Sequence, residues 1–182
     1  MGLITRVFEF DSAHRVMNER VKCFNIHGHR FKVELTFRYE DCPAIGYAID
    51  FKEIKRLCGT WLDEKFDHAI ILNPKDTALI DFVRANGYRL YVMGLGNDAD
   101  INPSAENLAY EIFSAMRRMF SSSRHGVVIE QVRLFETPNC WVDFRVLDRS
   151  PYVPAESFSE EFNAWRERMG NVSYDVRETD HA

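Results

Sequence analysis

Residues 31–39 read Phe-Lys-Val-Glu-Leu-Thr-Phe-Arg-Tyr, and apolar and polar side chains alternate along them without interruption. Successive side chains of a β-strand point to opposite faces of the sheet, so this alternation predicts a strand with one buried and one solvated face. Strands of this kind are typical of antiparallel sheets. We therefore expect an antiparallel sheet at the centre of the fold.

Two histidines stand at the entrance to this strand, in the sequence His27-Gly28-His29. Because residues i and i+2 of a strand share a face, both imidazoles can reach one ion, and the glycine between them permits close backbone approach. β-branched and aromatic residues predict an earlier strand at 4–11, and His14 lies just beyond it. If the two strands pair antiparallel, His14 comes to lie beside His27 and His29.

Three histidines with an open fourth position are the ligand set expected of a catalytic zinc rather than a structural one. Half of the six histidines of the chain lie within residues 14–29, which favours metal binding. The alternative is that these are surface or core histidines without a metal. Cys23, four residues before His27, is either a thiolate base activated by a nearby cation or a fourth ligand that closes the site.

Two further groups are candidates for proton chemistry. Asp67-His68 follows a predicted helix, and a carboxylate can fix the tautomer of an imidazole. On the residues alone, a satisfied pair at a helix terminus is the favoured interpretation. Glu136 ends a predicted strand, where alternation gives it the same face as Val128, Val132 and Leu134. A carboxylate on that face would be buried and would need a partner, either a ligand or an arginine.

The remaining pattern predicts an α+β domain with helices on one face of the sheet. Asp50 and Glu53 form a capping-box pattern at the start of the first helix. The expected elements are a helix at 51–64, a short helix at 78–83, a strand at 88–93, a helix from Ser104 to about 120, and strands at 127–136 and 141–147.

Composition changes at the end of the 182-residue chain. From residue 150 onward it has prolines, several carboxylates and few aliphatic side chains, with a possible helix at 160–169. We expect one domain over 1–149 and an appendage over 150–182.

Composition also limits the classes of function. Hydrophobic residues make up 46% and charged residues 28%, and there is neither a membrane-length apolar run nor a signal peptide, so we expect a cytoplasmic protein without a membrane partner. The cysteines at 23, 42, 58 and 140 form no Cys-x-x-Cys pair, which favours reduced thiols. The net charge of −5 argues against nucleic-acid binding.

Five basic residues lie near the histidines in the sequence: Arg15, Arg20, Lys22, Arg30 and Lys32. They either form a solvated surface or attract an anionic ligand by their charge.

Six motifs in order resemble the 6-pyruvoyl-tetrahydropterin synthase family. They are Phe10-Asp11-Ser12-Ala13-His14, Cys23-Phe24-Asn25-Ile26-His27-Gly28-His29, Ile49-Asp50-Phe51, Phe66-Asp67-His68, Asn102-Pro103-Ser104-Ala105-Glu106-Asn107-Leu108-Ala109 and Phe135-Glu136-Thr137. Together they span residues 10–137. The stretch 72–101 is longer than many members of this family need, and 150–182 lies outside the pattern.

The resemblance implies the tunnelling fold, a four-stranded antiparallel sheet with two helices on one face, assembled through sheet edges into rings. It implies a homo-oligomer, a hexamer built from trimers, with active sites between subunits. By the same resemblance, zinc would be bound by His14, His27 and His29. Cys23 would abstract the proton, and Asp67 and His68 would relay protons. Glu136 would bind the pterin and take a possible part in the relay, and the pterin pocket would be lined by Glu106 and Ser104. Capping of the second helix is the alternative role for Ser104 and Glu106.

The spacing of the cysteine separates the groups within the family. Three residues between Cys23 and His27 resemble the members that form 6-carboxytetrahydropterin from 7,8-dihydroneopterin triphosphate, releasing acetaldehyde and triphosphate, for queuosine and other 7-deazapurines. The members that form pyruvoyl-tetrahydropterin for biopterin typically have a longer spacing. Three alternatives stay open: such a synthase, a pterin-binding module without turnover, and a structural zinc protein with Cys23 as fourth ligand.

Overall fold

The structure, a computed structural model, describes residues 1–94, 101–121 and 126–145. The predicted appendage at 150–182, with its possible helix at 160–169, lies outside these residues. Within the described residues, no helix has the length and apolar character that spanning a bilayer requires.

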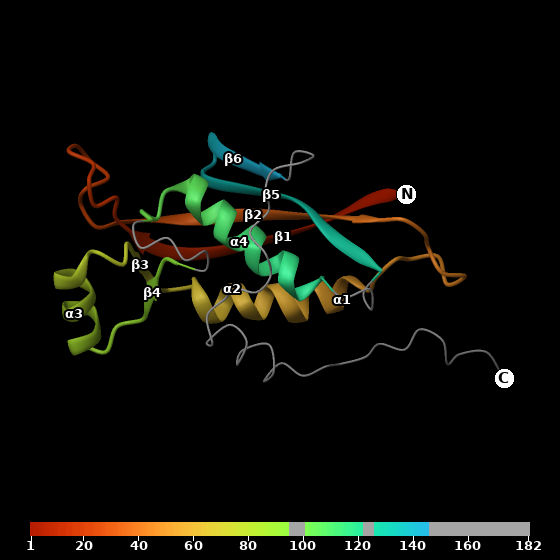
Figure 1. Cartoon of the computed structure of the whole chain (residues 1–182), viewed down its shortest axis with the longest axis horizontal. Coiled ribbons are helices and arrows are strands. Elements are labelled where there is room, and N and C mark those ends of the chain that lie inside the picture. Colours follow the sequence, from red (N-terminus) through yellow and green to blue (C-terminus); the bar gives the residue numbers. More distant parts are fainter. Residues whose placement is uncertain (95–100, 122–125, 146–182) are drawn as a thin grey trace.

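The centre of the fold is a curved sheet, in which the described residues form six strands (Figure 1). Four long strands are antiparallel neighbours, in the spatial order β1 (Gly2–His14), β2 (His27–Tyr39), β5 (Val127–Thr137) and β6 (Cys140–Arg145). Two short strands continue the sheet beyond β1 and run parallel to it, β3 (Ile70–Leu72) and β4 (Leu90–Val92).

The prediction of an antiparallel sheet is therefore confirmed for the four long strands and wrong in the total strand count. The strand expected at 88–93 is present as β4, but β3 was not predicted. A strand of three residues is too short for alternation to distinguish it from a loop. With α3 (Thr77–Ala85) between them, β3 and β4 form a small βαβ unit over residues 70–92, most of which belongs to the stretch 72–101.

Two helical rods cover one face of the long strands (Figure 1). The first runs without a break through α1 (Phe51–Ile54), a π-helical turn η1 (Lys55–Gly59) and α2 (Thr60–Lys65). The second is α4 (Ala105–Met119). The odd-numbered residues of β2 pack against them, so the predicted inward face of this strand is confirmed: Phe31, Val33, Leu35 and Phe37 are fully buried.

The capping box at the start of the first rod is only half formed. The Asp50 side chain accepts a hydrogen bond from the Lys52 backbone N–H at 2.8 Å, as an N-cap residue does. Glu53, however, is buried and binds the Arg56 guanidinium through both oxygens, at 2.7 and 2.8 Å. A nearby arginine therefore replaces the backbone N–H that the pattern had predicted as the partner of Glu53.

A β-bulge in β5 changes which side chains face the core. The pairing with β2 shifts between Thr36 and Phe37, so that alternation restarts on the other side of the bulge. Val132 and Leu134 are fully buried, but Val128 is 43% exposed. The predicted shared face of Val128 and Leu134 is therefore wrong.

Among the described residues, three stretches of strand edge have no partner strand: the outer edge of β4, most of β1 and the outer edge of β6. β1 pairs with β3 only at Ala13 and His14, so residues 2–12 present an open edge. β6 pairs only with β5, and its other edge is open. Long open edges are sites where another chain can add strands to the sheet.

Candidate metal centre and active site

The pairing of β1 with β2 brings three histidines together. His14 lies directly opposite His27 in the antiparallel register, and His29 lies two residues further along the same face. One nitrogen of each imidazole can be chosen so that all three lie within 4.8 Å of one another. The ring centroids are 4.5 to 5.3 Å apart. A single divalent cation can bind all three rings.

The buried environment of His14 leaves one ring nitrogen for a ligand. Its Nδ1 donates a hydrogen bond to the Pro103 carbonyl oxygen at 2.7 Å, and its buried Nε2 has no hydrogen-bond partner among the described residues. Burial lowers the pKa of His14, against an opposing contribution from the Pro103 hydrogen bond. The imidazole is therefore neutral at neutral pH, which is the form that binds a metal. His27 is similarly oriented, with Nδ1 2.8 Å from the Asn25 carbonyl oxygen.

Gly28 is required by the close approach of the two strands at this point. A Cβ atom at position 28 would lie 3.1 Å from the Ser12 carbonyl oxygen, closer than most such contacts in proteins. The absence of a side chain therefore allows β1 to come close enough for His14 to meet His27 and His29.

Glu136 lies beside the histidines. Its Oε1 atom is 3.6 Å from His14 Nε2, and its side chain is 32% exposed. Within the part of the chain that the structure describes, no arginine pairs with Glu136, and its side chain is only partly buried, so the predicted burial of this carboxylate is wrong. The β-bulge and the position of Glu136 at the end of β5 place it at the rim of the sheet, where the carboxylate can serve a metal or a bound molecule.

Cys23 is an exposed free thiol on the loop between β1 and β2. Its carbonyl oxygen accepts a hydrogen bond from the Val16 N–H at 2.8 Å, so the loop folds back toward the end of β1. Within the described residues, the group of side chains able to hold a metal consists of the three histidines and does not include Cys23.

Asp67 and His68 touch each other. His68 Nδ1 lies 2.7 Å from Asp67 Oδ2, and the other oxygen of Asp67 accepts a hydrogen bond from the Asp11 N–H at 2.9 Å. The carboxylate therefore favours the tautomer with a proton on Nδ1, which leaves Nε2 of an imidazole that is 74% exposed facing solvent. This geometry suits proton transfer to or from a molecule outside the chain.

His68 also has an unusual backbone conformation. Its φ angle is 57°, in the left-handed region that costs most residues about 1–2 kcal/mol. Its N–H donates to the Asp11 carbonyl oxygen at 2.6 Å. Backbone strain of this kind is common where a side chain is held in place for function. The main chain of Asp11 thus holds both members of the Asp67–His68 pair.

The start of α4 lies next to the histidines, because Pro103 directly precedes it. Ser104 is the N-cap of α4, and its hydroxyl accepts a hydrogen bond from the Asn107 N–H at 3.4 Å. The alternative interpretation of Ser104 as a cap is therefore confirmed. Glu106 is exposed in the first turn of α4.

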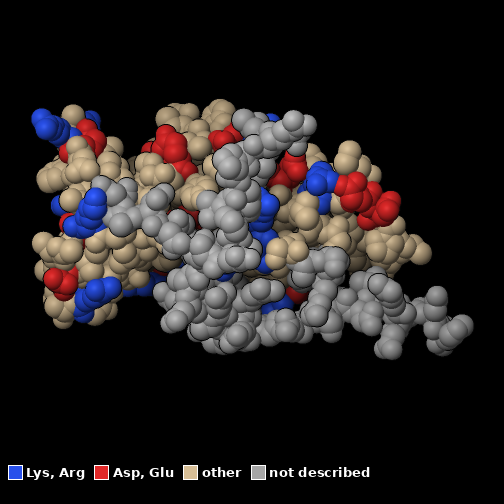
Figure 2. Space-filling model, in the orientation of Figure 1, with Lys and Arg blue, Asp and Glu red and all other residues tan. Residues whose placement is uncertain are grey.

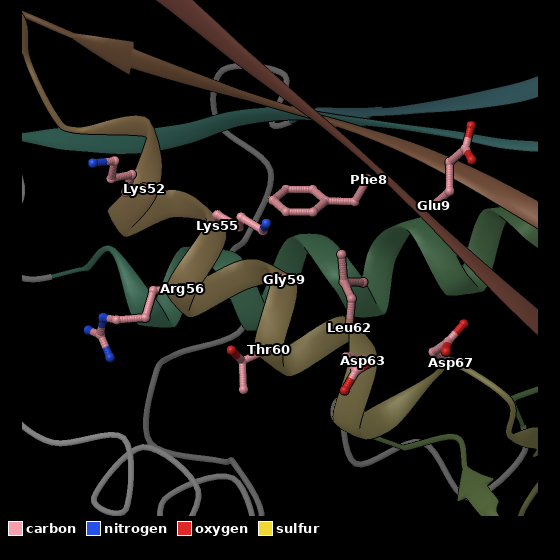
Figure 3. Close-up of a pocket in the computed structure, with 10 residues that line it drawn as sticks. All are labelled: Phe8, Glu9, Lys52, Lys55, Arg56, Gly59, Thr60, Leu62, Asp63 and Asp67. Carbon is pink, nitrogen blue, oxygen red and sulfur yellow. The ribbon is translucent and has the colours of Figure 1, made fainter.

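Two hollows lie beside the Asp67–His68 pair. The first, of about 580 Å³, opens between the free edge of β1 and the first helical rod, with Phe8 and Glu9 on one wall, Lys52 and Lys55 on the other, and Asp67 at one end (Figure 3). The second, of about 500 Å³, is lined by both His29 and His68, together with Arg30. Among the described residues, no hydrogen bond or ion pair joins the Asp67–His68 pair to the three histidines.

Several residues that shape the site were not predicted. Asp11 and Pro103 orient site residues through hydrogen bonds of their backbone atoms. The chemical type of a side chain does not indicate such a role. Asp76 is a buried carboxylate that meets Arg15, the residue after His14. Their proximity depends on how the segment after β3 packs, which periodicity does not reveal.

These features define a tunnelling-fold protein with a three-histidine centre capable of holding a metal. A family model described as 6-pyruvoyl tetrahydropterin synthase matches residues 3–146. The chain therefore belongs to the 6-pyruvoyl tetrahydropterin synthase family.

Relatives of known name support this membership. The chain is 35% identical over 141 residues to the 6-carboxy-5,6,7,8-tetrahydropterin synthase of Rickettsia bellii, covering 76% of this chain and 96% of that protein. It is 24% identical over 151 residues to the enzyme of the same name from Haemophilus influenzae, covering 80% and 99%.

Solved structures of more distant proteins share the fold. A protein of Wolinella succinogenes superposes with a TM-score of 0.62 at 19% identity, over 79% of this chain and 97% of that one. The 6-pyruvoyl tetrahydropterin synthase of Caenorhabditis elegans gives a TM-score of 0.57 at 23% identity, over 81% and 98%. The predicted fold class is therefore confirmed.

Proposed function

We propose that this chain is a zinc-dependent 6-carboxy-5,6,7,8-tetrahydropterin synthase. It converts 7,8-dihydroneopterin triphosphate to 6-carboxytetrahydropterin, acetaldehyde and triphosphate in the synthesis of queuosine and other 7-deazapurines, and it acts in the cytoplasm. The observation that carries the proposal is the convergence of three imidazoles, one with a buried and unpartnered Nε2, in a chain whose named relatives are 6-carboxy-5,6,7,8-tetrahydropterin synthases.

The donor set fits zinc. Three neutral imidazole nitrogens with room for a further ligand are typical of catalytic zinc sites, and the hydrogen bonds from His14 and His27 to backbone carbonyls are of the kind that orients such ligands. When bound, zinc would supply a Lewis acid for the two adjacent side-chain hydroxyls of the substrate.

Cys23 is the residue that we assign to proton abstraction. It is an exposed thiol, free to meet a substrate, on the loop that joins His14 to His27. Asp67 and His68 return the proton, because the carboxylate fixes the imidazole with Nε2 directed outward. Glu136 accepts hydrogen bonds from the amino-pyrimidine edge of the pterin and is a further candidate for the relay, while Ser104 and Glu106 line the pocket from the start of α4.

We further propose that the chain assembles through its sheet edges, as a hexamer built from trimers. The open edges of β1 and β6 support this assembly. The cleft of Figure 3 lies along the open edge of β1, where a neighbouring subunit would pack.

The test is a mass-spectrometric assay of zinc-loaded protein with 7,8-dihydroneopterin triphosphate. We expect 6-carboxytetrahydropterin and an equal amount of acetaldehyde. Pyruvoyl-tetrahydropterin as the product would instead place the protein in the biopterin branch of the family. Binding of the pterin without any product, in folded and zinc-loaded protein, would favour a binding module.

Figure 2 shows both basic and acidic side chains over the end of the molecule where the loop after β1 lies. Arg20 and Lys22 are exposed on this loop, which also carries Cys23. We propose that they attract the triphosphate. The double variant Arg20→Gln/Lys22→Gln is expected to raise KM about threefold to tenfold with little change in kcat, because an exposed charge contributes up to about 1 kcal/mol. The difference from the unsubstituted protein should shrink as ionic strength rises.

A second basic pair provides the comparison for this experiment. Lys52 and Lys55 line the cleft of Figure 3, on a different element. If Lys52→Gln/Lys55→Gln raises KM and Arg20→Gln/Lys22→Gln does not, the triphosphate binds in the cleft and the assignment to the loop is wrong.

A further inference from the structure

Arg15, the residue that follows His14, is held by a buried carboxylate from a distant segment. Its Nη2 donates to Asp76 Oδ1 at 3.2 Å, and its Nε lies 2.6 Å from Asp76 Oδ2 without hydrogen-bond geometry. The Asp76 side chain is only 6% exposed, and that of Arg15 is 22% exposed. Because a buried carboxylate needs a compensating cation, Arg15 has one strongly favoured position.

The same guanidinium also contacts Phe24, further along the loop. The Arg15 guanidinium carbon lies 4.8 Å from the centroid of the Phe24 ring, a cation–π contact. The neighbouring residue Val16 donates its N–H to the Cys23 carbonyl oxygen at 2.8 Å. Residues 15 and 16 therefore contact Cys23 and Phe24 directly, and they fix the thiol-bearing segment from two sides.

Three further hydrogen bonds make this part of the loop compact. Met17 donates its N–H to the Asn102 side-chain oxygen at 2.9 Å, which ties the loop to the segment before α4. Glu19 Oε2 accepts hydrogen bonds from the N–H groups of Val21 and Phe24, at 2.7 and 3.2 Å. Contacts within the loop and two anchors outside it, Asn102 and the buried Asp76, thus hold the segment that carries Cys23.

We propose that Arg15 is a positioning residue, which Asp76 and Phe24 hold so that the loop presents Cys23 to the three-histidine centre. The βαβ unit at the edge of the sheet then has a function, because its Asp76 supplies the anchor. The part of this proposal that concerns turnover depends on the proposed role of Cys23 as the base. The part that concerns loop position does not.

The test is Asp76→Asn in the full-length, zinc-loaded protein, with a nitroxide label on Cys23 and serine at the other exposed cysteines, Cys42 and Cys140. Loss of the anchor is expected to increase nitroxide mobility, while zinc stays at the stoichiometry of the unsubstituted protein. In unlabelled protein, kcat is expected to fall about tenfold to a hundredfold with KM changed by less than about threefold, because a displacement near 1 Å can cost this much. A merely structural role would not separate kcat from KM in this way.

Glu130→Gln is the matched control, because Glu130 also pairs with an arginine, Arg38, but on the exposed surface of β5. It should leave mobility and kcat unchanged. Phe24→Leu tests the same anchor without leaving a buried charge, and it should also increase nitroxide mobility, even if Asp76→Asn fails to fold. Unchanged mobility in a folded Asp76→Asn or Phe24→Leu variant would overturn the proposal. If the unsubstituted protein has no turnover, the proposed function fails, but the mobility measurement still decides whether Arg15 positions the loop.

Discussion

Cys23→Ala is expected to lower turnover of 7,8-dihydroneopterin triphosphate by a factor of about 10² to 10⁴, the range that a positioned general base contributes. The variant should retain its zinc and its fold. Cys23 is exposed and forms no disulfide, so its removal leaves neither a cavity nor an unpaired buried group. The measurement is the steady-state rate, together with metal content and thermal unfolding of the same preparation.

The alternative role of Cys23 as a fourth metal ligand predicts a different result. Loss of a ligand from a closed structural site removes the metal and its contribution to folding, so Cys23→Ala would then lose zinc and unfold at lower temperature. Cys42→Ala is the control, because Cys42 is also an exposed free cysteine but lies on the loop after β2. It should retain both zinc and turnover.

The long elements of the fold could be predicted because each repeats one pattern over several turns or pleats. Alternation along 31–39 identified β2 and its inward face, and the antiparallel pairing of β1 with β2, on which the predicted histidine cluster depended, is present. The apolar stripe from Ser104 onward identified α4. The hydrophobic periodicity of such elements is visible in their own residues, without knowledge of tertiary contacts.

The elements that were missed or misplaced depend on contacts between distant residues. β3 exists because Ile70 and Ile71 pair with the end of β1, and three residues carry too little pattern to show it. The outward turn of Val128 follows from an extra residue in β5 relative to β2, which alternation within β5 alone cannot detect.

The residues of the candidate site likewise fall into those that local patterns predicted and those that depend on distant contacts. The meeting of His14 with His27 and His29 follows from strand periodicity and pairing, and both could be predicted. The carbonyl of Pro103 that orients His14 comes from 89 residues further along the chain. Whether Asp67 and His68 touch depended on the left-handed conformation of His68, which the Asp11 main chain helps to hold. Residues distant in sequence set these orientations, so a local pattern cannot predict them.

His27→Ala is expected to weaken zinc binding about a hundredfold or more and to abolish turnover at stoichiometric zinc. A structural site with four ligands gains about 10–16 kcal/mol from zinc, so one ligand accounts for about 3 kcal/mol or more. His27 is the informative position, because it is partly exposed, whereas His14 is buried and its removal would also leave a cavity. The measurement is competition for zinc against a chromophoric chelator.

The control for this experiment is another histidine of the same chain. His68 is 74% exposed and lies outside the three-histidine group, so His68→Ala should bind zinc as the unsubstituted protein does, although its turnover should fall. Excess zinc should partly restore turnover to His27→Ala and not to His68→Ala, because only the first variant is limited by metal occupancy. Equal zinc affinity in His27→Ala and the unsubstituted protein would show that the three histidines do not hold the metal, and the function proposed for them would have to be abandoned.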